Sequence, residues 1–170
     1  MRNNNLVKKI TITAFLLALS SVLHYVEGFI PMPVPGFRLG LAILPCLFAL
    51  LYLGPSYYVI VSLLKVILVA LFQGFGTSFL LSIVGTSLSV IITFVLYQFT
   101  KSSIYTISIL GSYFHVLGQI IMYVVIVKNP YMFLYFPVLS IVGIGSGLVI
   151  ALIVSQLIKR IPQLNRLKAN

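Results

Sequence analysis

The stretch FLLSIVGTSLSVIITFVLYQF, residues 79–99, contains no charged side chain. A helix needs about 20 predominantly apolar residues to cross the hydrocarbon core of a bilayer, and this stretch is long enough. Similar runs lie on both sides of it, separated by short breaks of glycine, proline or polar residues. The pattern predicts an all-α fold, a single transmembrane domain with about six membrane-spanning helices. We expect helices at residues 10–25, 39–53, 57–72, 79–99, 104–127 and 132–158, followed by a basic tail at 159–170.

The second run, residues 39–53, is short for a span. At ~1.5 Å per residue it barely covers a ~30 Å core, so its ends must be shielded by protein or begin earlier in the preceding loop. That loop, Glu27–Gly36, contains three prolines and two glycines, which do not continue a helix. We interpret it as a structured loop or a re-entrant cap.

The composition excludes several classes of function. Only 7% of the residues are charged and 61% are apolar, whereas a soluble domain carries roughly 25% charged residues. Glu27 is the only acidic residue, so a carboxylate pair for glycoside hydrolysis and an aspartate-rich magnesium or calcium site are excluded. No nucleotide-binding P-loop and no metal-ligating set occurs. We therefore expect no catalytic residues, no metal, no cofactor and no enzymatic activity.

The basic residues predict the orientation in the membrane. With the N-terminus inside, the cytoplasmic flanks hold eight basic residues and the outer flanks hold Arg38 and Lys128. This bias predicts a multi-pass protein of the cell membrane with both termini in the cytoplasm, and it makes nucleic acid an unsuitable partner. The first run has some signal-peptide character, but we expect it to be retained. The eight basic residues of the cytoplasmic flanks are Arg2, Lys8, Lys9, Lys101, Lys159, Arg160, Arg166 and Lys168.

A few polar residues within or beside the spans are candidates for a functional site. Lys65 lies inside the third run, where an ionisable group either serves function or pairing or extends toward an interface. Glu27 could pair with Arg38 across the loop or contact a ligand. His115 and Gln119 are four residues apart and share a helix face, where they either bind a ligand or form interhelical hydrogen bonds.

Small residues mark possible helix contacts. Ala14 and Ala18 are four apart on the first helix, which allows another helix to approach closely. Gly143, Gly147 and Ala151 form a longer stripe on the last helix. We interpret that stripe as packing within the bundle.

With these residues in view, the chain resembles the Gx transporter family, also described as heptaprenyl diphosphate synthase component I. That family is similar to the substrate-binding S components of energy-coupling factor (ECF) transporters. The chain departs from the family pattern at Ile43 and Val116, where asparagine is usual, and at Lys65, where arginine is more frequent. The resemblance rests on VEGFIPMPVPGFRLGLA (26–42), LLKV (63–66), LLSIVGTSLS (80–89) and HVLGQ (115–119).

The resemblance implies a six-helix S-component fold with an outward-facing substrate site. Loops after the first, third and fifth helices would cap this site, here at residues 27–38, 73–78 and 128–131. It also implies that Ala14 and Ala18 contact a transmembrane coupling subunit, which works with ATPases. Together with the residue analysis, this gives as candidate substrate contacts Glu27, Arg38, Lys65, Gln73, His115 and Gln119.

Three functional hypotheses follow. The first is a substrate-binding membrane subunit of an ECF-type transporter for a vitamin, cofactor or precursor, with a ligand of anionic character. The second is a non-catalytic membrane partner of an isoprenoid, quinone-synthesis or electron-transfer assembly; a prenyl synthase itself would need aspartates to hold magnesium. The third is a proton-coupled carrier that depends on Glu27.

Overall fold

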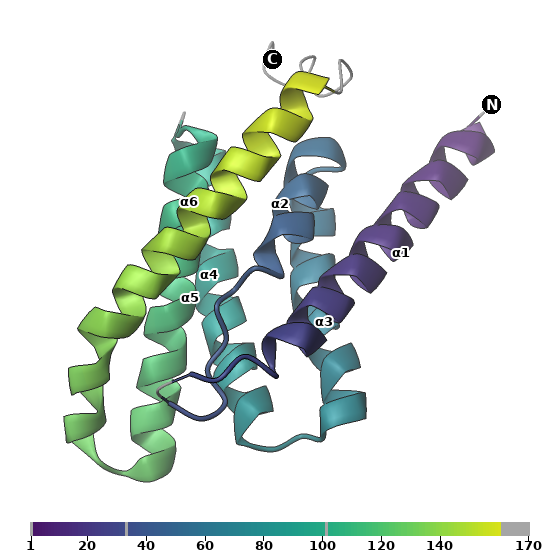
Figure 1. Cartoon of the computed structure of the whole chain (residues 1–170). Helices are drawn as coiled ribbons and strands as arrows, with labels where there is room; N and C mark the ends of the chain where they lie inside the picture. The colour runs from purple at the N-terminus through teal and green to yellow at the C-terminus, as the bar shows by residue number, and fades with distance from the viewer. Residues whose placement is uncertain (1, 33, 101, 161–170) are drawn as a thin grey trace.

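The computed structural model describes residues 2–32, 34–100 and 102–160, and it forms a bundle of helices with no strand in these ranges (Figure 1). Five helical segments are long and apolar enough to cross a membrane, which confirms the predicted helical membrane bundle. The elements are α1 (Arg2–Glu27), α2 (Ile43–Tyr52), α3 (Pro55–Gln73), α4 (Thr77–Phe99), α5 (Ile104–Val127), the short 3₁₀ helix η1 (Pro130–Tyr135) and α6 (Phe136–Arg160).

The second helix differs most from the prediction. We expected a span at 39–53, but α2 begins at Ile43 and has 10 residues, or about 15 Å at the usual rise. Its length covers only half of a ~30 Å hydrocarbon core. Gly40 precedes it with φ +86, a left-handed conformation that glycine adopts readily and other residues rarely do. The chain therefore enters the bundle as a loop and becomes helical only inside it (Figure 1).

Both ends of the predicted helix series also differ. The first helix was expected at 10–25, but α1 extends from Arg2 to Glu27. The last was expected at 132–158, but a 3₁₀ segment at Pro130–Tyr135 precedes α6, with a proline in its first turn. Proline fits this position because its missing N–H has no partner at a helix start. The predicted basic tail, from residue 161 onward, lies outside the described residues.

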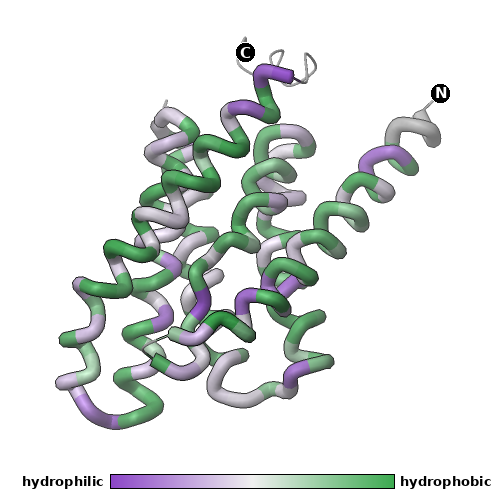
Figure 2. Tube along the Cα trace, in the orientation of Figure 1, coloured by the Kyte–Doolittle hydropathy of each residue, from purple (hydrophilic) through white to green (hydrophobic). Residues whose placement is uncertain are grey.

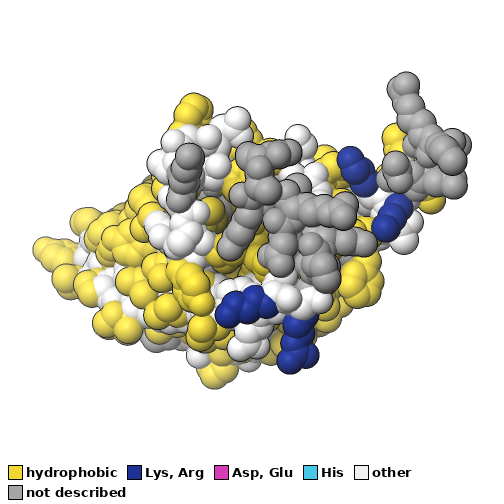
Figure 3. Space-filling view, turned by 90° about the horizontal axis from the view of Figure 1, so that it is seen from above, with side chains coloured by type: hydrophobic (Ala, Val, Ile, Leu, Met, Phe, Trp, Pro, Cys, Tyr) yellow, Lys and Arg dark blue, Asp and Glu magenta, His cyan; other side chains and the backbone are white. Residues whose placement is uncertain are grey.

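The two ends of the bundle differ in content. The chain termini and the α2–α3 and α4–α5 connections lie at one end, which we call the termini end; the α1–α2 loop and the α3–α4 and α5–η1 connections lie at the other, which we call the loop end (Figure 1). At the termini end the basic side chains of Lys8, Lys9, Lys159 and Arg160 are exposed. Figure 3 views this end, and no acidic side chain is coloured on it.

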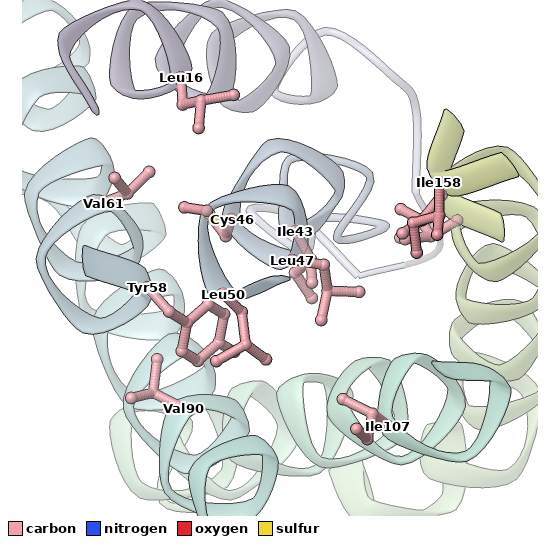
Figure 4. Packing of buried hydrophobic residues seen from close by; sticks show 13 residues of the cluster. Leu16, Ile43, Cys46, Leu47, Leu50, Tyr58, Val61, Val90, Ile107 and Ile158 are labelled. Atoms are coloured by element: carbon pink, nitrogen blue, oxygen red, sulfur yellow. The ribbon is translucent and has the colours of Figure 1, made fainter. Parts of the chain in front are cut away.

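A hydrophobic cluster around α2 fills the half of the bundle near the termini end. Cys46, Ala49 and Leu50 of α2 are fully buried, and they pack with side chains from the surrounding helices (Figure 4). The long helices are mostly hydrophobic along their length (Figure 2), and large apolar side chains are exposed on them, such as Phe15 on α1 and Ile141 on α6. Apolar residues on both the inside and the outside of a bundle are expected when lipid surrounds it.

Glycines bring α4, α5 and α6 close together. A Cβ added to Gly118 of α5 would lie 2.7 Å from the Cα of Gly85 in α4. On α6, a Cβ at Gly147 would lie 2.8 Å from the Cα of Ile109, and one at Gly143 would lie 2.8 Å from a methyl group of Val116. The predicted stripe of small residues on the last helix therefore serves packing, as in other membrane bundles.

The close crossing gives a direct prediction. The Gly118→Ala variant is expected to lower the free energy of unfolding by about 1–3 kcal/mol, because the new methyl group overlaps backbone atoms that cannot turn aside. Gly145 provides a matched control on α6, since nothing lies within 4 Å of a Cβ placed there. Equilibrium unfolding of the purified Gly118→Ala and Gly145→Ala variants in mixed micelles measures the two free energies. Equal effects of Gly118→Ala and Gly145→Ala would contradict this helix crossing.

Candidate functional site

The segment Arg38–Ala42 enters the bundle interior as a loop, in which the carbonyl oxygens of Gly40 and Leu41 accept turn hydrogen bonds from the N–H groups of Ile43 and Leu44. Arg38 is 4% exposed and Ala42 is fully buried. A non-helical backbone at membrane depth is tolerated only where protein groups satisfy its N–H and C=O groups. The candidate residues from the sequence are found around this segment, and three of them, Glu27, Lys65 and Gln119, bond to its backbone.

Glu27 ends α1 and receives two backbone N–H groups. Its Oε1 accepts a hydrogen bond from the N–H of Ala42 at 2.8 Å, and its Oε2 accepts one from Gly40 at 3.3 Å. The side chain is 2% exposed. The ion pair with Arg38 that the sequence allowed is not formed between these two described residues. The carboxylate instead fixes the entry of α2.

Lys65 of α3 meets the same residue from the other side. Its Nζ donates to the carbonyl oxygen of Ala42 at 3.1 Å, and the Ser20 hydroxyl of α1 donates to that oxygen at 2.7 Å. Lys65 is 2% exposed, so its ammonium group stays in the interior and does not extend to an interface. The side chains of Glu27 and Lys65 thus hold the two polar groups of one residue, Ala42.

Gln119 of α5 bonds to the backbone of Arg38 as a neighbouring strand would. Its Oε1 accepts from the Arg38 N–H at 3.0 Å, and its Nε2 donates to the Arg38 carbonyl at 3.1 Å. Ser146 of α6 donates to the carbonyl of Leu39 at 2.9 Å. We call Glu27, Lys65, Gln119, Ser20 and Ser146 the loop-anchoring cluster. It takes one or two residues from each of α1, α3, α5 and α6.

His115 lies on the same face of α5 as Gln119, as predicted, and is 2% exposed. Its ring packs against the loop, since its Cδ2 would lie 3.4 Å from a Cβ placed on Gly40. A residue other than glycine at position 40 would therefore be strained by the positive φ, and its side chain would crowd this ring. In this structure His115 therefore supports the loop by packing against it.

Arg38 connects the loop to the α3–α4 connection. Its Nη1 donates to the carbonyl of His24 at 2.7 Å, and its Nη2 donates to the Oε1 of Gln73 at 2.5 Å and to the Ser78 hydroxyl at 3.1 Å. Burial lowers the pKa of the Arg38 guanidinium, and attraction to Glu27 opposes this. The guanidinium keeps its charge at any physiological pH.

A cavity of about 450 Å³ opens at the loop end, directly beyond these contacts. Its volume falls within the roughly 300–1,000 Å³ typical of small-molecule sites. Of the candidate residues, only Gln73 lines it, whereas Glu27, Lys65, His115 and Gln119 lie deeper. The lining residues are Gly28, Phe29, Ile30, Pro31, Met32, Pro35, Gly36, Phe37, Gln73 and Ser78.

The structure therefore brings six predicted residues to one region of the loop and leaves two apart. Ala14 and Ala18 are exposed on α1, nearer the termini end. The sequence analysis missed Ser20, Ser78 and Ser146 as partners of the loop and its arginine. A single serine among many in apolar helices gives no pattern by which it could be selected.

Comparison with known proteins gives one match. A family model described as heptaprenyl diphosphate synthase component I matches residues 16–157. No curated protein and no solved structure matches the chain. The matched region contains the α1–α2 loop and every member of the loop-anchoring cluster.

Proposed function

Because the chain belongs to the heptaprenyl diphosphate synthase component I family, we propose that it is the non-catalytic, substrate-binding membrane subunit of an ECF-type small-molecule transporter. A separate coupling subunit and ATPases supply the energy. The protein resides in the cell membrane with both termini in the cytoplasm, so the loop end faces outward. Substrate binds at the loop end and crosses as the bundle reorients.

The observation that carries this proposal is the loop-end cavity and what lies beneath it. The cavity of about 450 Å³ is lined by aromatic, aliphatic and proline residues of the α1–α2 loop, together with Gln73 and Ser78. Arg38 donates to both of these polar residues from below. The wall of this cavity therefore combines apolar side chains with polar groups, and small-molecule sites also combine the two.

The anchoring of the loop also suits a binding subunit. Glu27, Lys65 and Gln119 contact the loop through hydrogen bonds to its backbone groups. A ligand that offers similar acceptors and donors can take over some of these bonds. We therefore expect these three residues to contact a ligand only after the loop moves. Gln73, in contrast, already lines the cavity.

The exposed face of α1 supports the coupling step. Ala14 and Ala18 are exposed, and large apolar neighbours on this helix are exposed as well, such as Phe15 at 66%. Among the described elements, α1 packs mainly against α2 and α3, and its N-terminal part leans away from α6 (Figure 1). Two alanines one turn apart let a partner helix approach closely.

A ligand panel tests the binding function. Thermal unfolding of the purified protein is measured with vitamins, flavins and short isoprenoid diphosphates. We expect a saturable increase in the melting temperature with at least one anionic or aromatic compound, because a ligand of the folded state stabilises it by RT ln(1 + [L]/Kd). A flat response to the entire panel would count against substrate binding.

Replacement of the two alanines tests the coupling contact. The double variant Ala14→Leu/Ala18→Leu is expected to lose the co-purifying coupling subunit and ATPases, because leucines separate the helices. Gly145→Leu is a matched control, since it adds a bulky side chain to the exposed face of α6, where a Cβ has nothing within 4 Å. Retention of the complex by the alanine double variant would contradict the assigned contact.

A second candidate function follows from the family description itself. A component I implies a partner in isoprenoid diphosphate synthesis, so the chain would be a non-catalytic membrane partner of a synthase. In that case a synthase co-purifies in place of the ATPases, and Ala14→Leu/Ala18→Leu leaves that complex intact. The same pull-down therefore separates the two candidates.

A further inference from the structure

A small chamber next to Arg38 contains polar atoms without partners. Its lining includes Arg38, Gln73, Ser78 and Ser82. Within the described part of the chain, the Nε of Arg38 and the hydroxyl of Ser82 have no hydrogen-bond partner. Both side chains are buried, at 4% and 1% exposure. Such groups are costly unless something absent from the protein itself satisfies them.

The charge balance of the interior points to the kind of group that is missing. Glu27 is the only acidic residue of the entire chain, and its oxygens bond to the N–H groups of Gly40 and Ala42. Two buried cations, Arg38 and Lys65, therefore share one carboxylate. Arginine does not lose its charge, and a buried charge without a partner is strongly unfavourable. The excess is positive, so an anion restores the balance and a metal cation does not.

The chamber adjoins the proposed substrate cavity. Gln73 and Ser78 line both, so the two spaces are neighbours. The chamber admits the centre of a water-sized sphere over about 10 Å³, close to the space of one water-sized group. One oxygen of an anionic group or a single halide ion matches this size, whereas an entire phosphate or diphosphate group is too large.

We propose that this chamber is an anion subsite, in which Arg38 Nε and the Ser82 hydroxyl both donate to a small monoanionic group. The inference rests on the proposed function and deepens it: the substrate carries a carboxylate or a similar single negative charge, held at Arg38, while its larger apolar part lies in the loop-end cavity. The recognition is charge-assisted and therefore stronger than a neutral hydrogen bond.

The experiment uses formate and chloride as probes and gluconate as the bulky reference anion. The melting temperature of the full chain in detergent is measured against the concentration of each sodium salt. We expect formate or chloride to raise it in a saturable way at constant ionic strength, and gluconate to leave it unchanged. A wild-type protein that responds equally to all three salts overturns the subsite.

Two variants assign the effect to the chamber. Ser82→Ala is expected to weaken the apparent affinity for the anion about 10-fold, the cost of one charge-assisted hydrogen bond, yet without the anion it is at least as stable as wild type because the lost hydroxyl has no partner. Ser140→Ala is the matched control, since Ser140 is another buried hydroxyl without a partner, on α6. Arg38→Gln is expected to abolish the response. Unchanged affinity in Ser82→Ala overturns the subsite even if Arg38→Gln does not fold.

The two proposals fail in different ways. If the ligand panel stabilises the protein but its active compounds are uncharged and formate and chloride have no specific effect, the anion subsite is wrong and substrate binding stands. If formate or chloride binds through Ser82 but the panel gives no response, the subsite stands and the transport proposal loses its support. A carboxylate-bearing panel compound whose affinity falls in Ser82→Ala supports both, and it identifies the substrate acid as the natural occupant.

Discussion

Replacing Glu27 with alanine is expected to lower the free energy of unfolding by about 3–5 kcal/mol, as for other broken buried charge contacts. The substitution affects two backbone N–H groups and two buried cations at once. The N–H groups of Gly40 and Ala42 lose their acceptor, and Lys65 and Arg38 lose the only carboxylate in the chain. Unfolding of the purified variant in mixed micelles measures the effect.

The Glu27→Gln variant separates hydrogen bonding from charge. It keeps one acceptor oxygen near the two N–H groups, so its loss should be smaller, about 1–3 kcal/mol. Removing Lys65 as well, by Lys65→Met, should cost less in the Glu27→Gln background than in wild type, because the uncompensated cation is gone. A coupling energy below about 0.5 kcal/mol in this double-mutant cycle would contradict the shared anchoring of Ala42.

Gln119→Leu is expected to be the second most destabilising substitution. The side-chain amide is the partner of both the N–H and the C=O of Arg38, and leucine has a similar size but can satisfy neither. Each buried backbone group left without a partner costs about 1–3 kcal/mol, so we expect the two groups together to cost at least about 2 kcal/mol. The same unfolding measurement applies.

Gln98 of α4 is the matched control for this substitution. It is exposed, and Gln98→Leu removes an equivalent amide without stranding a buried backbone group. We expect it to change the unfolding free energy by less than about 0.5 kcal/mol, as for most surface substitutions. Similar losses in Gln119→Leu and Gln98→Leu would mean that the amide of Gln119 does not support the loop.

The sequence predicts the helical bundle well because one physical requirement dominates it. Long uncharged runs such as residues 79–99 have few alternatives to a membrane-spanning helix, since lipid leaves no other way to satisfy their backbone groups. The start of α2 is not predictable in this way. Leu39, Leu41 and Ala42 are as apolar as helical residues, and tertiary contacts stabilise this stretch outside a helix, from Ser146 to Leu39 and from Glu27 and Lys65 to Ala42.

The sequence predicts which residues form the candidate site, but it does not predict what they bond to. Ionisable and amide side chains are rare in the spans, so Lys65, His115 and Gln119 could be selected from sequence by their cost in lipid. Their partners could not be selected, because they are backbone atoms of a loop whose path depends on the folded structure. The same limit applies to Ser82, whose lack of a partner is a property of the packed interior.

Hydrogen exchange at the segment Arg38–Ala42, measured on the full chain in lipid nanodiscs, tests the central claim most directly. The account predicts that the N–H groups of Arg38, Gly40 and Ala42 exchange slowly although they are not helical, because Gln119 and Glu27 bond to them. It also predicts that Glu27→Ala accelerates exchange at Gly40 and Ala42. Exchange in the wild-type protein as fast as that of the exposed residues Phe75 and Gly76 in the α3–α4 connection would contradict an anchored loop inside the bundle.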